Sequence, residues 1–147
     1  IEHFSPENLL PGAREAVAAT RRAGLKTALA SASRNAPLLL ERLGIAELFD
    51  YVVDAGNIRH ATPDPEIFLA AAAGLGLAPA DCLGVEDAAA GVASIHAAGM
   101  AAVGIGDTRA LHQADVVLPA IAAFDITDFA TPEKKTQDER GHVPPIV

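Results

Sequence analysis

The 147-residue chain has the length of one domain, and half of its residues are hydrophobic, so it can bury a core of ordinary size. Its net charge of −8, without any basic run, excludes double-helical nucleic acid as a ligand, because an acidic surface repels the phosphate backbone. No apolar run is long enough to span a membrane, and the single cysteine, Cys82, has no partner for an internal disulfide. These features predict a cytoplasmic protein that binds neither nucleic acid nor a membrane.

Helix and strand patterns alternate along the chain after an irregular lead-in over residues 1–9. In chain order, the pattern predicts a helix over residues 12–23, a strand over 26–31, a helix over 35–43, a strand over 51–54, a helix over 65–75, a strand over 82–86, a helix over 88–98 and strands over 101–105 and 115–118. Short strands alternating with helices of about ten residues indicate an α/β fold with a parallel sheet over residues 10–130. Residues 131–147, rich in charge and proline, are predicted to form a poorly ordered tail.

Polar residues collect where the predicted strands end. Parallel α/β sheets bind ligands at the carboxyl ends of their strands, so these residues are the first functional clue. They are Ser31, Asp54, Glu86 with Asp87, and Asp107.

Two of these positions suit phosphate chemistry. The hydroxyl of Ser31, just before a helix, can bind a phosphate oxygen, although helix capping by Ser31 or Ser33 is the favoured interpretation of that position alone. The adjacent carboxylates of Glu86 and Asp87 attract a hard cation such as Mg²⁺. Helix capping by Asp87, with Glu86 solvated, explains the same pair equally well.

The remaining candidates are weaker. For Asp54 and Asp107, turn formation is favoured over a supporting role in a site. Arg59 and His60 precede Thr62-Pro63 in a loop, where an arginine can meet a phosphate but is more often solvated. His96 is expected at the surface or in packing, and Cys82 is expected to be a small buried hydrophobe.

Four segments together resemble the haloacid-dehalogenase-like phosphotransferases, in the order seen in that family. They are L-A-S-A-S-R-N at residues 29–35, T-P-D-P-E-I-F at 62–68, G-V-E-D-A at 84–88 and V-G-I-G-D at 103–107. The serine segment is similar to that of β-phosphoglucomutases in particular. The resemblance covers about residues 9–107 and implies a Rossmann-like, three-layer α/β core with a parallel sheet.

The resemblance also implies roles for single residues. Ser31 would bind the transferring phosphoryl group, and Ala32 would supply a backbone amide. Arg34 and Asn35 would hold the phosphate of the substrate, and Glu86 and Asp87 would bind or orient Mg²⁺. The implied reaction moves a phosphoryl group between positions of a hexose phosphate through an aspartyl-phosphate.

The chain departs from this family in two ways. Nothing before Leu9 resembles the Asp-x-Asp segment of the central first strand or the helical cap, so no catalytic nucleophile is assigned. The sheet is therefore expected to be incomplete, with a slot that the rest of a longer protein or a partner chain fills. Thr62 stands where the family usually has a lysine, and Arg59 or His60 is the candidate to replace that charge.

Three functions remain open at this point. The leading one is Mg²⁺-dependent phosphoryl transfer on a hexose phosphate, performed as part of a larger β-phosphoglucomutase-like enzyme. A sugar phosphatase of the same superfamily is the first alternative. The second is a catalytically inactive module that binds a sugar phosphate or a partner.

Overall fold

The computed structural model describes residues 12–129 and 145–146. The helices are α1 (Ala13–Arg22), α2 (Ala36–Leu43), α3 (Glu66–Leu75) and α4 (Ala89–Ala97). The strands are β1 (Ala28–Leu29), β2 (Tyr51–Val52), β3 (Leu83–Glu86), β4 (Ala101–Ile105), β5 (Val116–Leu118) and β6 (Pro145–Ile146). Every one of these except β6 lies within a segment that the sequence predicted.

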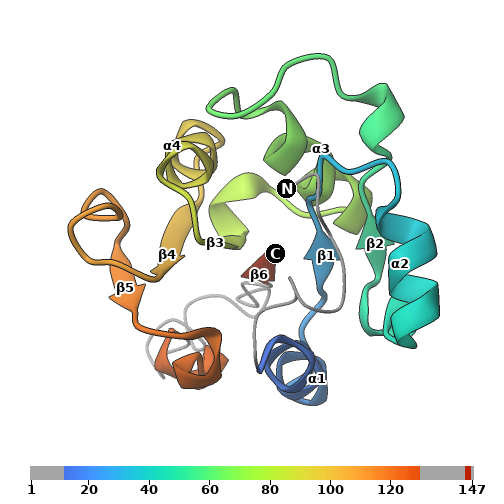
Figure 1. Ribbon diagram of the computed structural model, residues 1–147, viewed down its shortest axis with the longest axis horizontal. Coiled ribbons are helices and arrows are strands. Elements are labelled where there is room, and N and C mark those ends of the chain that lie inside the picture. Colours follow the sequence, from blue (N-terminus) through green and yellow to red (C-terminus); the bar gives the residue numbers. More distant parts are fainter. Residues whose placement is uncertain (1–11, 130–144, 147) are drawn as a thin grey trace.

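The strands form one sheet in the order β2-β1-β6-β3-β4-β5, and all neighbouring pairs are parallel (Figure 1). The predicted α/β fold with a parallel sheet is therefore confirmed. Helices α2 and α3 end at Gly44 and Gly76, each with a φ of 72°, a conformation that favours glycine. These two glycines stop their helices and let the chain turn back toward the sheet.

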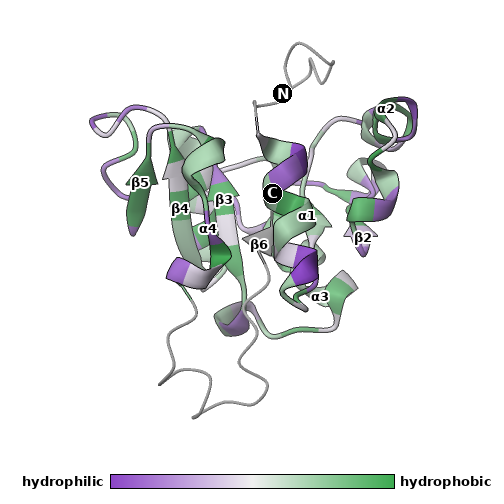
Figure 2. Cartoon of the chain, turned by 90° about the horizontal axis from the view of Figure 1, so that it is seen from below, coloured by the Kyte–Doolittle hydropathy of each residue, from purple (hydrophilic) through white to green (hydrophobic). Residues whose placement is uncertain are grey.

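Helices cover both faces of the sheet and make three layers. On one face, α3 and α4 pack buried side chains such as Phe68 and Ile95 against the strands. The other face buries Leu83, Val85 and Val103 against α1 and two short 3₁₀ helices, η5 (Ile121–Ala123) and η6 (Ile126–Asp128). Leu83 and Val85 lie two residues apart and share a face, as the alternation of a strand requires. Figure 2 shows β5 and most of β3 and β4 in the green of hydrophobic residues.

Strand β6 occupies the position that was expected to be an empty slot. It lies between β1 and β3, with Ile146 paired to Ala28 on one side and to Gly84 on the other. Parallel strands on both sides present unpaired amide and carbonyl groups, so even two extended residues can pair there. Residues 145–146 were assigned to the tail on sequence grounds, whereas the rest of that segment and the lead-in over residues 1–9 lie outside the described residues.

Within the described part of the chain, no helix combines the length and the apolar character needed to cross a membrane.

Candidate functional site

Because the strands are parallel, their carboxyl ends lie along one edge of the sheet, and the polar residues that end or follow the strands gather there. Ser31 follows β1 by two residues, and Glu86 is the last residue of β3. Strand β6 lies between these two strands, and neighbouring strands are about 4.8 Å apart, so the backbones that carry Ser31 and Glu86 are separated by roughly 10 Å across the sheet. Asp54 and Asp107 follow the outer neighbours β2 and β4.

The carboxylate of Glu86 folds back over the start of α4. Its Oε1 accepts hydrogen bonds from the backbone amides of Asp87, at 2.8 Å, and Ala88, at 3.2 Å. Helix α4 takes Ala88 as its N-cap, so Asp87 is not the capping residue, and Glu86 is only partly exposed. The capping alternative for this pair is therefore wrong.

The environment of Glu86 opposes its negative charge. Burial raises the pKa of the Glu86 carboxyl to about 7, and the neighbouring Asp87 carboxyl adds to this effect, against the two backbone amides that lower it. A bound cation would stabilise the ionised forms of these two adjacent carboxyl groups, because its positive charge offsets their mutual repulsion. Oxygen-only donors at this position fit Mg²⁺.

Gly91 provides the space into which the Glu86 side chain folds. A Cβ atom built at Gly91 would lie 2.1 Å from Cγ of Glu86 and 2.2 Å from both Cδ and Oε2. No such contact is sterically tolerated, so the bare backbone at this position is a cradle for the carboxylate. The oxygen donors of Glu86, held in this space, and of its neighbour Asp87 fit a bound Mg²⁺.

Ser31 and Ser33 shape the turn between β1 and α2. The hydroxyl of Ser31 accepts the amide of Ser33 at 3.1 Å, and that of Ser33 accepts the amide of Asn35 at 3.2 Å. The N-cap of α2 is Asn35, so neither serine is the helix cap that the sequence favoured. Because a hydroxyl both donates and accepts, the O–H of Ser31 can still donate to a ligand. Ala32, Arg34 and Asn35 are exposed on the same turn.

Asp54 and Asp107 have the turn role that the sequence favoured. Asp54 accepts the amide of Gly56 at 3.0 Å and the side-chain amide of Asn57 at 3.2 Å, which caps the 3₁₀ helix η3 (Ala55–Asn57). Asp107 accepts the amide of Arg109 at 2.9 Å. Both carboxylates are thus engaged in local backbone structure.

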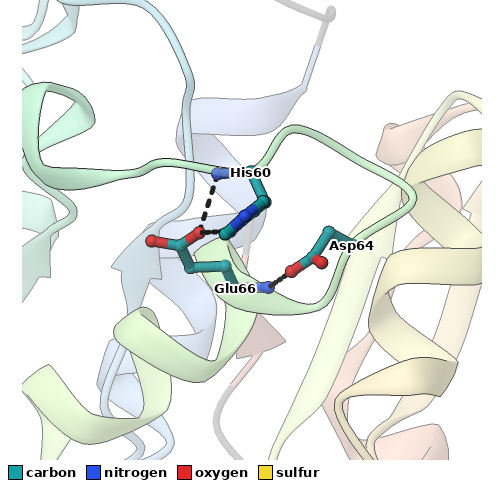
Figure 3. A group of neighbouring side chains, drawn as sticks. All are labelled: His60, Asp64 and Glu66. Atoms are coloured by element: carbon teal, nitrogen blue, oxygen red, sulfur yellow. Dashed lines mark hydrogen bonds and ion pairs between the residues drawn. The ribbon is translucent and has the colours of Figure 1, made fainter.

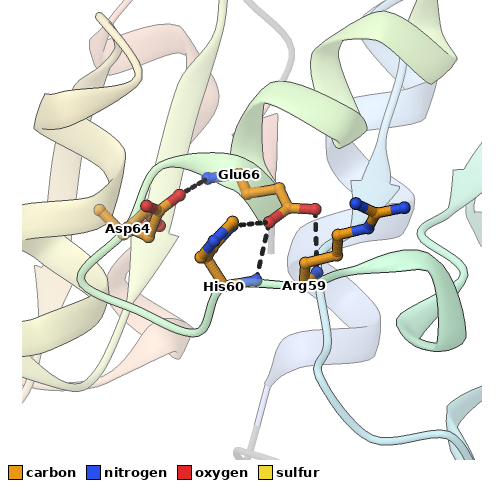
Figure 4. Close-up of polar contacts among 5 residues, drawn as sticks. Arg59, His60, Asp64 and Glu66 are labelled. Atoms are coloured by element: carbon orange, nitrogen blue, oxygen red, sulfur yellow. Dashed lines mark hydrogen bonds and ion pairs between the residues drawn. The ribbon is translucent and has the colours of Figure 1, made fainter.

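The loop that contains Thr62 is held by the carboxylate of Glu66. Its two oxygens accept the backbone amides of Arg59, at 3.0 Å, and His60, at 2.8 Å (Figures 3 and 4). Nδ1 of His60 lies 3.0 Å from the same oxygen that accepts its amide. The amide of Arg59 first, and the amide and ring of His60 next, lower the pKa of Glu66 despite some opposing desolvation.

The end of this loop is fixed as well. Asp64 accepts the backbone amide of Glu66 at 2.9 Å, and the buried hydroxyl of Ser94 on α4 donates to the carbonyl of Asp64 at 2.6 Å. Thr62 itself is exposed. Figure 4 shows the side chain of Arg59 extending away from Asp64, on the far side of Glu66.

His60, Asp64 and Glu66 form the one group of three potential metal ligands among the described residues, with donor atoms within 4.8 Å of one another. The carboxylate oxygens of Asp64 and Glu66 already accept backbone amides of this loop and of the helix start after it. The group of His60, Asp64 and Glu66 therefore acts first as a loop clamp. Sequence reasoning singled out His60 and missed Glu66. The available signal was an acidic residue in the first turn of a helix directly after Thr62-Pro63.

The side chains of His96 and Cys82 have structural environments. Nε2 of His96 lies 3.0 Å from Asp115, whose carboxylate also accepts the amide of Ala102 at 2.7 Å. This arrangement ties α4 to the strands beside it. Cys82 is buried, and burial raises the pKa of its thiol to about 11, which leaves it unreactive, as expected.

Comparison with known proteins identifies the family of this chain. A family model described as haloacid dehalogenase-like hydrolase matches residues 2–99. A β-phosphoglucomutase from Bacillus subtilis (strain 168) is 45% identical over 118 residues, which are 80% of this chain and 52% of that protein. Hexitol phosphatase B from Escherichia coli (strain K12) is 33% identical over 134 residues, which are 88% of this chain and 58% of that protein.

Solved structures show the same fold. The crystal structure of a β-phosphoglucomutase from Clostridium difficile superposes with a TM-score of 0.80 at 36% sequence identity, and the match covers 85% of this chain and 56% of that one. The chain therefore spans somewhat more than half the length of the relatives that it matches.

Proposed function

Because the chain belongs to the haloacid dehalogenase-like hydrolase family, we propose that it supplies the phosphate- and Mg²⁺-binding edge of an enzyme that transfers a phosphoryl group on a hexose phosphate. The observation that carries this proposal is the Glu86–Asp87 pair at the end of β3, two strands from Ser31 at the end of β1. Two acidic groups and a phosphate-binding turn at one sheet edge suit a reaction whose main requirement is charge neutralisation.

Each residue has a distinct task in this proposal. The O–H of Ser31 donates to an oxygen of the phosphoryl group, and the backbone amide of Ala32, an exposed residue, provides a second donor. Arg34 and Asn35 hold the phosphate of the substrate from the same turn. When bound by Glu86 and Asp87, Mg²⁺ supplies the positive charge that offsets the charge of the phosphoryl group. No residue of this chain is assigned as the attacking carboxylate.

A side chain from the loop held by Glu66 is proposed to replace the positive charge of the lysine that the family usually has at the position of Thr62. Glu66 fixes the backbone of Arg59 and His60, so both side chains leave from a defined position. Arg59 is the better candidate, since the ring of His60 is engaged by Glu66 and the guanidinium of Arg59 extends away from the clamp. Unchanged turnover by an Arg59→Ala variant would remove this idea.

The product distinguishes the two enzymatic functions. The polypeptide that its source organism makes should be incubated with β-glucose 1-phosphate, with and without Mg²⁺, while glucose 6-phosphate and free phosphate are followed separately. Mg²⁺-dependent formation of glucose 6-phosphate is the expected result and matches the higher identity to the phosphomutase than to the phosphatase. Release of free phosphate alone would identify a sugar phosphatase instead.

The variants Glu86→Ala and Asp87→Ala should each abolish turnover. Asp125→Asn is the control, because Asp125 only forms a local turn with Thr127.

A catalytically inactive module that binds a sugar phosphate is the second candidate function. The threonine at position 62 favours it, because a hydroxyl cannot provide the positive charge of a lysine. Saturable binding of glucose 6-phosphate without turnover by the complete polypeptide would support this function.

A further inference from the structure

We propose that Gly91 is a positioning residue for the cation site, because its missing side chain lets the Glu86 carboxylate fold onto the first turn of α4. The proposal rests on the proposed function in one respect, namely that Glu86 and Asp87 bind Mg²⁺. It adds a residue that makes no contact with the cation itself.

The steric argument is specific to one pair of residues. The three atoms nearest to a Cβ built at Gly91 are Cγ, Cδ and Oε2 of Glu86, at 2.1, 2.2 and 2.2 Å. An alanine and the present Glu86 side chain therefore cannot occupy this space together. Glu86 would have to rotate away, and both amide hydrogen bonds to its Oε1 would be lost.

Helix propensity points the same way. The residues just before Gly91 are Ala88, Ala89 and Ala90, so this helix start is otherwise built from the best helix former. Glycine is among the poorest helix formers, and the helix would gain from a fourth alanine. The glycine stands at the position of this run that Glu86 covers, which indicates that placing the carboxylate outweighs the local preference of the helix.

Glu86 is a flexible side chain at the rim of the sheet, so an alanine at Gly91 should move the carboxylate while the fold persists. Gly84 offers a matched contrast at the same β3–α4 contact. A Cβ at Gly84 would lie 2.6–2.7 Å from Ile95, a fully buried residue that cannot rotate into water. Gly84→Ala should therefore lower the stability of the fold, and Gly91→Ala should weaken cation binding.

The experiment measures Mn²⁺ binding by electron paramagnetic resonance, with Mg²⁺ as competitor, and thermal unfolding of the same samples. Gly91→Ala should weaken Mn²⁺ binding roughly 10- to 100-fold, the usual effect of losing support for a metal ligand, with little change in the unfolding midpoint. In a Glu86→Ala background, Gly91→Ala should have no further effect on Mn²⁺ affinity. Gly84→Ala should lower the unfolding midpoint by the same amount with or without Glu86.

Two results would overturn the inference. One is Mn²⁺ affinity in Gly91→Ala equal to that of the unaltered chain, and the other is an equal loss of affinity from Gly91→Ala with and without Glu86. Absence of Mn²⁺ binding by the unaltered chain would instead contradict the proposed function. The amide resonances of Asp87 and Ala88 would then decide the role of Gly91, since Gly91→Ala and Glu86→Ala should shift them alike, and unshifted resonances in Gly91→Ala would overturn it.

Discussion

Glu66 holds His60 by two atoms of the same residue: the backbone amide donates to Oε1 over 2.8 Å, and the imidazole Nδ1 lies 3.0 Å from that oxygen. The other carboxylate oxygen accepts the amide of Arg59. One side chain thus fixes two consecutive peptide groups six and seven residues upstream. The loop gains a defined shape although His60 and Arg59 are exposed.

Glu66→Ala is expected to release this loop without unfolding the domain, because the lost contacts lie at the surface. Amide hydrogen exchange of Arg59 and His60 should become several-fold faster, while exchange within β3 and β4 stays unchanged. Glu41→Ala, an exposed change on α2, serves as the control. Unchanged exchange at both amides in Glu66→Ala would show that the carboxylate does not restrain the loop.

The pKa of Glu66 predicts the pH at which the same release occurs. Its pKa is lower in the folded protein than in the unfolded chain, chiefly because the Arg59 amide donates to the carboxylate. The hydrogen bonds therefore stabilise the loop above the unfolded-state pKa and are lost as the pH falls through the folded-state value. Exchange at Arg59 and His60, corrected for its intrinsic pH dependence, should accelerate only in acid. Corrected exchange rates at Arg59 and His60 that are as fast at neutral pH as in acid would contradict this assignment.

The pKa of Glu86 is shifted in the opposite direction to that of Glu66. Burial raises its folded-state pKa to about 7, so its contribution to stability is present below the unfolded-state pKa and is lost as the pH rises through about 7. In the presence of a chelator, the unfolding midpoint should therefore fall between pH 5 and pH 8 by more in the unaltered chain than in Glu86→Gln. Mg²⁺ binds the ionised form, so it should raise the midpoint at pH 8 and have little effect at pH 5. Equal Mg²⁺ effects at the two pH values would contradict this.

Ser94 anchors the other end of the clamped loop through a fully buried hydroxyl that donates to the Asp64 carbonyl at 2.6 Å. Ser94→Ala leaves this carbonyl without its buried donor, which should cost about 1–3 kcal/mol of unfolding free energy. Urea unfolding measures the change. Thr20→Val is the matched control, because the buried Thr20 hydroxyl donates to Ala16 within its own helix. A loss in Ser94→Ala no larger than that of Thr20→Val would rule out the anchoring role.

Asp50 joins the end of α1 to the start of β1. It accepts Arg21 at 2.7 Å and the amide of Thr27 at 2.8 Å. Burial alone would raise the pKa of Asp50, but these two donors outweigh it and the pKa is lowered. Asp50→Ala should cost about 1 kcal/mol at pH 7, a modest value because the ion pair is partly exposed, and the difference should shrink as the pH falls through the folded-state pKa. Asp128→Ala, an exposed change on η6, is the control in urea unfolding.

The sequence predicted the four helices and five of the six strands, β1 to β5, because local patterns determine them. Apolar spacing, glycines after helices and short β-branched runs all act within a few residues. Strand β6 was missed, since two residues in a charged, proline-rich segment carry no strand pattern, and only the unpaired edges of β1 and β3 create a place for them. Pairing of residues 145–146 with strands that lie far away in the sequence is a tertiary effect that no local pattern records.

In the candidate site, too, some residues could be identified from local sequence patterns, whereas the roles of others depend on tertiary contacts. Ser31, Glu86 and Asp87 were found because polar residues stand out at the ends of apolar strands. The roles of Glu66 and Gly91 depend on contacts to Arg59, His60 and Glu86 that exist only once the loop and helix are folded. The helix-cap interpretation of Ser31 failed for a related reason, because α2 begins at Ala36, five residues after that serine, and its N-cap is Asn35.

The most direct test of a Mg²⁺ site at Glu86 and Asp87 is the position of Mn²⁺ in an anomalous-scattering map from crystals grown with MnCl₂ and inorganic phosphate. The expected result is a peak coordinated by the carboxylates of Glu86 and Asp87, with phosphate at the turn that begins at Ser31. A Mn²⁺ peak at His60, Asp64 and Glu66, with none at Glu86 and Asp87, would contradict it and would make the loop clamp the metal site.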